Sequence, residues 1–134
     1  MIWGVGIDIV EIKRIGSAVN KSKNFLEKIL NEQEIQYLAK RNLRCEYIAG
    51  RFAAKEAVAK ALGTGFRGFN FKDIIIENTN LGKPVVILKN KAKDIASKKG
   101  KYNIHLSISH SNDNAIAYAV WEVYDYENRN SSNE

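Results

Sequence analysis

The sequence predicts a single α+β domain in which a mainly antiparallel sheet packs with helices. Its 134 residues suffice for one hydrophobic core, and 45% of them are hydrophobic. Short apolar runs typical of strands are separated either by helical stretches or by clusters of turn-forming residues. The order β, α, α, α, β, β, α, β, β favours directly joined strand pairs. We expect the domain to span residues 1–124 and a polar tail to follow over residues 125–134.

The first half of the chain begins with a predicted strand at residues 2–10. Its alternation places Asp8 on the face opposite to the apolar side chains at positions 5, 7 and 9. A helix is predicted over residues 11–30, with a break near residues 20–22. Asn31 and Glu34 have the spacing of a capping box, so a short helix should run from there to about residue 41.

The second half contains a long helix, a hairpin and two closing strands. The helix is predicted over residues 43–62 and should stop at Gly63, because glycine accepts the left-handed conformation at a helix end. Runs at 74–76 and 85–88, with Pro84 opening the second, predict a hairpin. Asn90 is the expected cap of a helix that ends at Gly100. Strands at 103–109 and 115–124, joined by a turn at 110–114, complete the sheet.

The formal net charge of +6 is concentrated in two segments. Residues 13–28 hold five basic residues against Glu27, and residues 89–101 hold six lysines against Asp94. These residues fit either solvated helix faces or a surface that attracts an anionic partner. A nucleic-acid-binding module is one such alternative, but the sequence has no aromatic RNA-binding motif, zinc finger or basic helix pattern. We therefore expect no nucleic acid as a partner.

Cysteine content and hydropathy indicate an intracellular protein. Cys45 is the single cysteine, which excludes an internal disulfide, and the sequence shows no signal peptide. No apolar run approaches the roughly 18 residues that a membrane span requires. We expect a cytoplasmic location and no membrane partner.

The strongest candidates for chemistry are Asp8, Glu56 and Lys60. Residues 51–62 contain five alanines, and Glu56 and Lys60 lie on one face of the predicted helix, away from Arg51 and Lys55. Glu56 and Lys60 also fit an ordinary i,i+4 ion pair, and Asp8 fits a helix cap. Together, however, two carboxylates on rigid elements suit Mg²⁺, which prefers oxygen ligands and completes its shell with water and phosphate.

Two further segments have alternative interpretations. The glycine-rich residues 63–68 follow a helix instead of opening one, so they form a helix stop and turn or bring backbone amides to a phosphate, but no P-loop. Residues 107–111 read SISHS and suit anion binding or a plain turn. A serine hydrolase is disfavoured, because no GxSxG segment is present.

Taken together, these segments resemble the holo-[acyl-carrier-protein] synthase family, the short-chain branch of the 4′-phosphopantetheinyl transferases. The resemblance covers residues 2–123. It is carried by VGIDIVEI at 5–12 with Arg14, GRFAAKEA at 50–57 with Lys60 and GTG at 63–65, GKP at 82–84, and SISHS at 107–111. Ala53 suits this branch, since the wider superfamily often has Ser, Cys or Thr there. The resemblance implies the 4′-phosphopantetheinyl transferase fold.

The resemblance implies transfer of 4′-phosphopantetheine from coenzyme A to a serine of apo acyl carrier protein, with release of adenosine 3′,5′-bisphosphate, in support of fatty acid biosynthesis. Asp8 and Glu56 would bind Mg²⁺, and Lys60 would pair with a phosphate oxygen. The implied coenzyme A site consists of Arg51, Lys60, Gly63, Gly65, Ser109 and His110. The implied contacts with the acidic carrier are Arg14, Lys21 and Phe25. Family members are homotrimers with sites between subunits.

Several alternatives stay open at this point. An inactive family member that only binds the carrier would keep the same fold. The sequence does not choose between Glu56 and a water molecule as the acceptor of the serine proton. It does not identify the preferred carrier, the subunit that supplies each site residue, the use of Mn²⁺ or a role for the tail.

Overall fold

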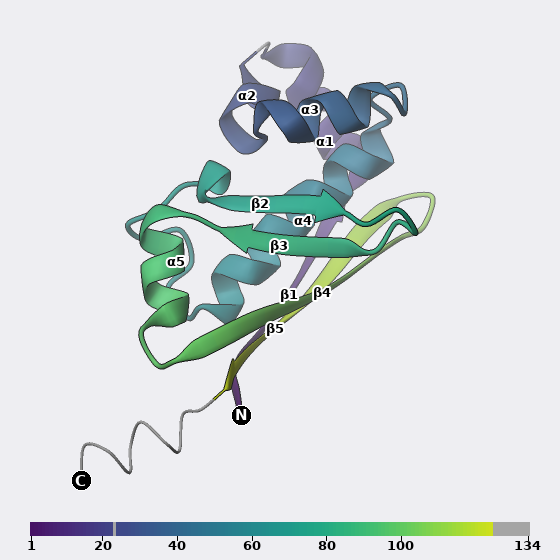
Figure 1. The fold of residues 1–134 in the computed structure, drawn as a ribbon. Helices are drawn as coiled ribbons and strands as arrows, with labels where there is room; N and C mark the ends of the chain where they lie inside the picture. Colours follow the sequence, from purple (N-terminus) through teal and green to yellow (C-terminus); the bar gives the residue numbers. More distant parts are fainter. Residues whose placement is uncertain (23, 125–134) are drawn as a thin grey trace, which may run out of the picture.

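The computed structural model describes residues 1–22 and 24–124 and confirms the α+β fold (Figure 1). The expected polar tail at 125–134 lies outside the described residues. The elements, in chain order, are β1 (Ile2–Glu11), α1 (Ile12–Lys21), α2 (Phe25–Ile29), α3 (Glu32–Ala39), α4 (Cys45–Ala61), the 3₁₀ helix η1 (Phe71–Asp73), β2 (Ile74–Asn78), β3 (Pro84–Leu88), α5 (Asn90–Ser97), β4 (Lys101–His110) and β5 (Asn114–Tyr124).

The strands form two antiparallel sheets where one was expected. The first has the order β1-β5-β4, and the second is the β2–β3 hairpin. In the first sheet, Asp8 is paired with Ala117, which is paired in turn with Ile108. Helix α4 lies between the two sheets, and its alanines share one core with residues from both of them. Helix α4 therefore connects the two sheets through one shared hydrophobic core.

The predicted helix ends are mostly confirmed. The break in the first helical segment occurs after Lys21, and Gly63 adopts a φ of 81° beyond the end of α4. The expected cap at Asn90 is wrong: Lys89 is the N-cap of α5, and the Asn90 side chain donates instead to Asp73 Oδ1 at 2.8 Å. Helix α5 also ends at Ser97, before the expected stop at residue 100.

Strand β1 and helix α4 approach each other without intervening side chains. A Cβ atom on Gly4 would overlap the carbonyl oxygen of Ala61, and a Cβ atom on Gly6 would overlap that of Ala57. Ala57 and Ala61 are themselves buried. The small residues on both elements thus set the distance between β1 and α4.

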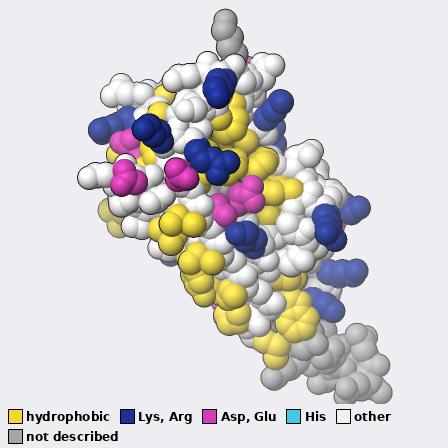
Figure 2. Space-filling model, turned by 180° about the vertical axis from the view of Figure 1, so that it is seen from behind, with side chains coloured by type: hydrophobic (Ala, Val, Ile, Leu, Met, Phe, Trp, Pro, Cys, Tyr) yellow, Lys and Arg dark blue, Asp and Glu magenta, His cyan; other side chains and the backbone are white. Residues whose placement is uncertain are grey.

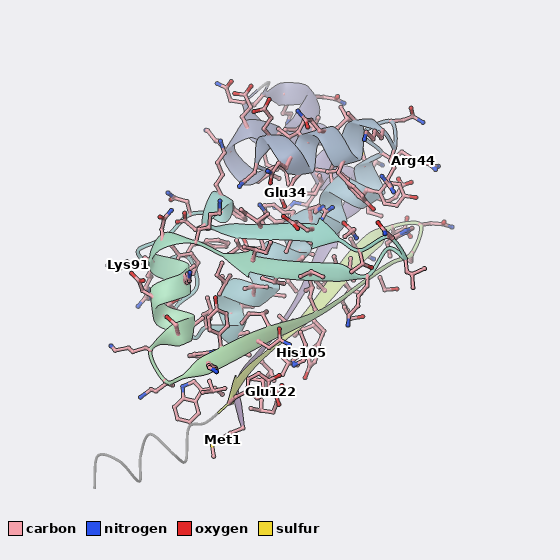
Figure 3. All side chains as sticks on the ribbon, in the orientation of Figure 1. Met1, Glu34, Arg44, Lys91, His105 and Glu122 are labelled. Carbon is pink, nitrogen blue, oxygen red and sulfur yellow. The ribbon has the colours of Figure 1, made fainter. Side chains whose placement is uncertain are left out.

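A second face of α4 carries charge into the interior. Lys55 is fully buried, and its ammonium donates to the Glu34 carboxylate of α3 at 2.8 Å. Glu34, which lies between α3 and β2 in Figure 3, also accepts the Ile76 amide at 3.1 Å and the Asn31 amide at 2.9 Å. The last contact is one arm of the predicted capping box. Burial lowers the pKa of Lys55, and the Glu34 carboxylate opposes that shift.

We predict that Gly6→Ala destabilises the protein by about 2 kcal/mol or more, because the added methyl group must push β1 away from the α4 backbone. Denaturant unfolding followed by circular dichroism measures the change. Gly16→Ala is the matched control. Its new Cβ would meet a side-chain atom instead of a backbone atom, the Cys45 Sγ of α4 at 3.3 Å. Gly16 lies inside α1, where alanine is favoured over glycine by about 0.5–1 kcal/mol. Equal stability of the Gly6→Ala and wild-type proteins would contradict the close packing described here.

Candidate active site

The structure brings Asp8, Glu56 and Lys60 together where β1 crosses α4. Strand alternation directs Asp8 to the same side as Gly6, toward the helix. The Lys60 ammonium donates to Asp8 Oδ1 at 3.1 Å and to the Ile7 carbonyl at 3.0 Å. The ion pair of Lys60 therefore reaches across to the strand, and it is not the simple i,i+4 pair along α4. The N-cap of α1 is Glu11, so Asp8 does not serve as a helix cap.

The Asp8 carboxylate is close enough to shift the pKa of Glu56. Burial raises the pKa of Glu56, the negative charge of Asp8 raises it further, and the Lys60 ammonium lowers it. The Asp8 side chain is mostly covered, whereas about half of the Lys60 side chain is exposed. The site therefore concentrates negative charge that the half-exposed Lys60 ammonium partly neutralises.

The donor set at this crossing fits Mg²⁺. Two carboxylates from rigid elements are available, and Mg²⁺ commonly binds one or two carboxylates together with water and phosphate oxygens. Among residues 1–22 and 24–124, no group of three or more His, Cys, Asp and Glu side chains could hold a metal ion. A site of Asp8 and Glu56 would thus leave most coordination positions to water and a bound substrate.

A second cluster lines a cavity of about 280 Å³ near the start of α4. Arg51 and His110, both expected at the coenzyme A site, lie here. The buried Arg51 guanidinium donates to the Ile76 carbonyl at 2.8 Å and to Asn78 Oδ1 at 2.6 Å. The His110 ring meets the Tyr47 ring edge to face, with 6.1 Å between the centroids. The cavity combines cationic and aromatic groups, a chemistry suited to a phosphorylated nucleotide.

The remaining expected coenzyme A residues lie elsewhere. The Gly63 amide donates to the Lys60 carbonyl at 2.9 Å and the Gly65 amide to the Ala59 carbonyl at 3.2 Å, so both amides cap α4. Ser109 is paired with the exposed Ile116, on the face of the sheet opposite to Asp8. Because Ser109 and His110 are consecutive strand residues, their side chains point to opposite faces. The structure therefore forms no Ser–His nucleophile pair at these positions.

The outer face of the three-stranded sheet is apolar and exposed. Figure 2 shows hydrophobic side chains gathered over the lower part of this side of the molecule. The exposed hydrophobic residues of β1 and β5 that share this face, which we call the outer face, include Val5, Ile7, Ile9, Ile116 and Tyr118, each between 37% and 63% exposed. Ser109 lies at the β4 edge of the outer face. A monomer would leave this hydrophobic surface in water.

The expected carrier contacts occupy the helical end of the molecule. Arg14 and Lys21 are exposed on α1 and line one shallow hollow. Phe25 begins α2 and stacks on Phe52, with 6.3 Å between the ring centroids. Phe25, Phe52 and Glu56 line an open cavity of about 840 Å³. The structure therefore places the expected carrier contact beside one of the two carboxylates.

The sequence reasoning missed two features of this region. The first is the aromatic lining of the larger cavity, to which Phe66, Phe69 and Phe71 also contribute. Three phenylalanines within six residues after α4 were the available signal. The second is the buried pair of Lys55 and Glu34, for which the chain gives no local signal.

Comparison with known proteins identifies the family. Residues 4–119 match the model of the 4′-phosphopantetheinyl transferase superfamily. The chain is 63% identical over 123 residues to the holo-[acyl-carrier-protein] synthase of Clostridium kluyveri, an alignment that covers 92% of both chains. The chain belongs to the holo-[acyl-carrier-protein] synthase family.

Solved structures of synthases agree with this assignment. The Neisseria meningitidis synthase is similar with a TM-score of 0.84 and 38% identity, covering 91% of this chain and 99% of that one. The Helicobacter pylori synthase in complex with coenzyme A is similar with a TM-score of 0.77 and 35% identity, covering 88% of this chain and 99% of that one. The described residues contain no helix that is long and apolar enough to cross a membrane.

Proposed function

We propose that this protein transfers 4′-phosphopantetheine from coenzyme A to a serine of apo acyl carrier protein and releases adenosine 3′,5′-bisphosphate. The observation that carries this proposal is the meeting of Asp8, Glu56 and Lys60 at the β1–α4 crossing. Relatives that carry the synthase name, one of them in complex with coenzyme A, support the choice of substrates. We further propose that the reaction depends on Mg²⁺ and supports fatty acid biosynthesis in the cytoplasm.

In the proposed reaction, a bond forms between the carrier serine oxygen and phosphorus as the bond from phosphorus to the bridging diphosphate oxygen breaks. Asp8 and Glu56 would hold Mg²⁺, which supplies positive charge to the diphosphate when bound. Lys60, half-exposed and already turned to Asp8, adds an ammonium for a phosphate oxygen. The serine proton passes to Glu56 or to water, and we favour water.

We propose that the coenzyme A site is completed by a second copy of the chain. Arg51 and Lys60 are nine residues apart on α4, which corresponds to about 13 Å of helix rise. Ser109 faces away from Asp8, on the apolar outer face. Association through the outer face into a homotrimer would cover its hydrophobic side chains and bring Ser109 of one copy to the site of another. The amides of Gly63 and Gly65 already cap α4 and are not free to bind a phosphate. These two residues would instead leave open space in which coenzyme A can lie.

We propose that the carrier docks on α1 and α2. The exposed charges of Arg14 and Lys21 suit an acidic helix of the carrier. Phe25 would supply the apolar contact at the edge of the larger cavity, next to Glu56. This arrangement presents the carrier serine to the carboxylate side of the site.

We predict that Glu56→Gln lowers the transfer rate at least about a hundredfold while the protein stays folded, because an amide cannot replace the carboxylate charge at the site. The measurement is the mass gain of one phosphopantetheine on an apo carrier incubated with coenzyme A and Mg²⁺. Glu77→Gln, an exposed carboxylate on β2, is the control and should keep the wild-type rate. No mass gain with the wild-type enzyme and competent substrates would refute the proposed function.

We predict that Ile7→Lys converts the protein to a folded monomer with little transferase activity, because a charge at the centre of the outer face prevents burial. Sedimentation equilibrium measures the mass, and the carrier assay measures the activity. Leu81→Lys also replaces an aliphatic residue with lysine, but at a fully exposed position in the β2–β3 turn, and should leave both unchanged. A fully active wild-type monomer would rule out the assembly.

A further inference from the structure

The Lys55 ammonium uses its hydrogen-bonding capacity inside the protein. It donates to the Ile29 carbonyl at 2.6 Å, to Glu34 Oε1 at 2.8 Å and to the Phe71 carbonyl at 3.1 Å. Its side chain is fully buried, and three acceptors match the three donors of an ammonium group. Lys55 is therefore committed to the interior, although its neighbour in sequence, Glu56, faces the candidate active site.

The two carbonyls belong to two different segments that form walls of the large aromatic cavity. Ile29 is the last residue of α2, and Phe71 is the first residue of η1. Both residues line the cavity together with Phe25 and Glu56. The Lys55 ammonium thus links both walls to α4 by hydrogen bonds, at the residue that precedes Glu56.

Both walls are very short helices: η1 has a capping box between Asn70 and Asp73, whereas α2 has no side-chain cap. Helix α2 has five residues and η1 has three, and helices this short are not stable without tertiary contacts. Stacking of Phe52 on both Phe25 and Phe71 adds contact but does not fix the backbone in one position. The hydrogen bonds from Lys55 are directional and act on the backbone itself.

A buried ion pair is an unusual way to stabilise a core. Hydrophobic residues of similar volume often do as well or better, since both charges must leave water. An apolar side chain at position 55 could fill the same space, but it could not bind two carbonyls from separate segments. The contribution that only Lys55 makes is therefore a direct link from α4 to the backbone of both cavity walls.

We propose that Lys55 is a positioning residue for carrier binding, which holds α2 and η1 at a fixed distance from Glu56. This inference rests on the proposed function, because the cavity is taken as the place where the carrier docks. Lys55 touches neither substrate. It acts through the backbone of Ile29 and Phe71. In this way it influences the direction from which the carrier serine approaches.

The test uses the double variant Lys55→Met/Glu34→Gln in the full-length protein. Changing both residues avoids leaving the Glu34 carboxylate buried without its partner, which would confuse positioning with stability. The control, Lys93→Met/Glu77→Gln, makes the same substitutions at exposed positions on α5 and β2. Circular dichroism establishes that both variants are folded.

In the double variant, KM for the apo carrier should rise about tenfold, as expected when hydrogen bonds that order a docking surface are lost. KM for coenzyme A should stay within about twofold of the wild-type value, since none of the three acceptors of the Lys55 ammonium lines the cavity around Arg51. Amide hydrogen exchange should speed up in residues 25–30 and 70–74, and the control should match the wild type in all three measurements. A merely structural role would change stability without this separation of the two KM values.

The outcomes separate the two proposals. A folded double variant with wild-type KM for the carrier would overturn the positioning role while leaving the transferase function intact. If the wild type transfers no phosphopantetheine, the proposed function fails. Independently of that result, unchanged hydrogen exchange in the double variant would overturn the claim that Lys55 holds α2 and η1 in place. If the double variant does not fold, Lys55→Gln/Glu34→Gln replaces it, with the same criteria.

Discussion

The contact between β1 and α4 is the constraint on which the rest of the structure depends. Glycine on the strand and alanine on the helix let the two backbones touch, and this brings Asp8 into range of Glu56 and Lys60. The same closeness has an electrostatic cost, because burial and then the charge of Asp8 raise the pKa of Glu56. Lys60 offsets part of that cost from one helical turn away. The small residues of α4 therefore do more than fill the core: they determine how strongly two acids interact.

Helix α4 directs side chains toward three different parts of the molecule, which explains why it combines many alanines with charged residues. Alanines face the two sheets, Glu56 and Lys60 face the candidate active site, and Arg51 and Lys55 are directed into the protein toward β2, α2 and α3. The inward charges form hydrogen bonds with backbone groups of α2, η1 and β2. Ile76 shows this clearly, because its carbonyl accepts from Arg51 and its amide donates to Glu34. Charged side chains thus replace a neighbouring strand at the edge of the β2–β3 hairpin.

Local patterns in the sequence were enough to predict most of the fold and the central carboxylates. Alternation in the first strand and helical spacing around Glu56 are short-range properties, and tertiary packing did not override them. The Lys55–Glu34 pair could not be predicted in this way, because its partners are 21 residues apart and Lys55 resembles a solvated charge. The error at Asn90 has a similar origin: its amide side chain finds a tertiary partner in Asp73. Sequence reasoning fails where a polar group is satisfied by a distant segment.

The position of Ser109 relative to Asp8 limits what one copy of the chain can do. Strands β1 and β4, which flank β5 in the three-stranded sheet, place these two side chains on opposite faces, and the sheet itself lies between them. No side-chain rotation moves a residue through a paired sheet. If both residues contact one coenzyme A molecule, they must come from different copies, and the outer face is the surface that could join them. The exposed isoleucines beside Ser109 would then pack against the second copy and position it at the site. Neither copy can complete that site alone.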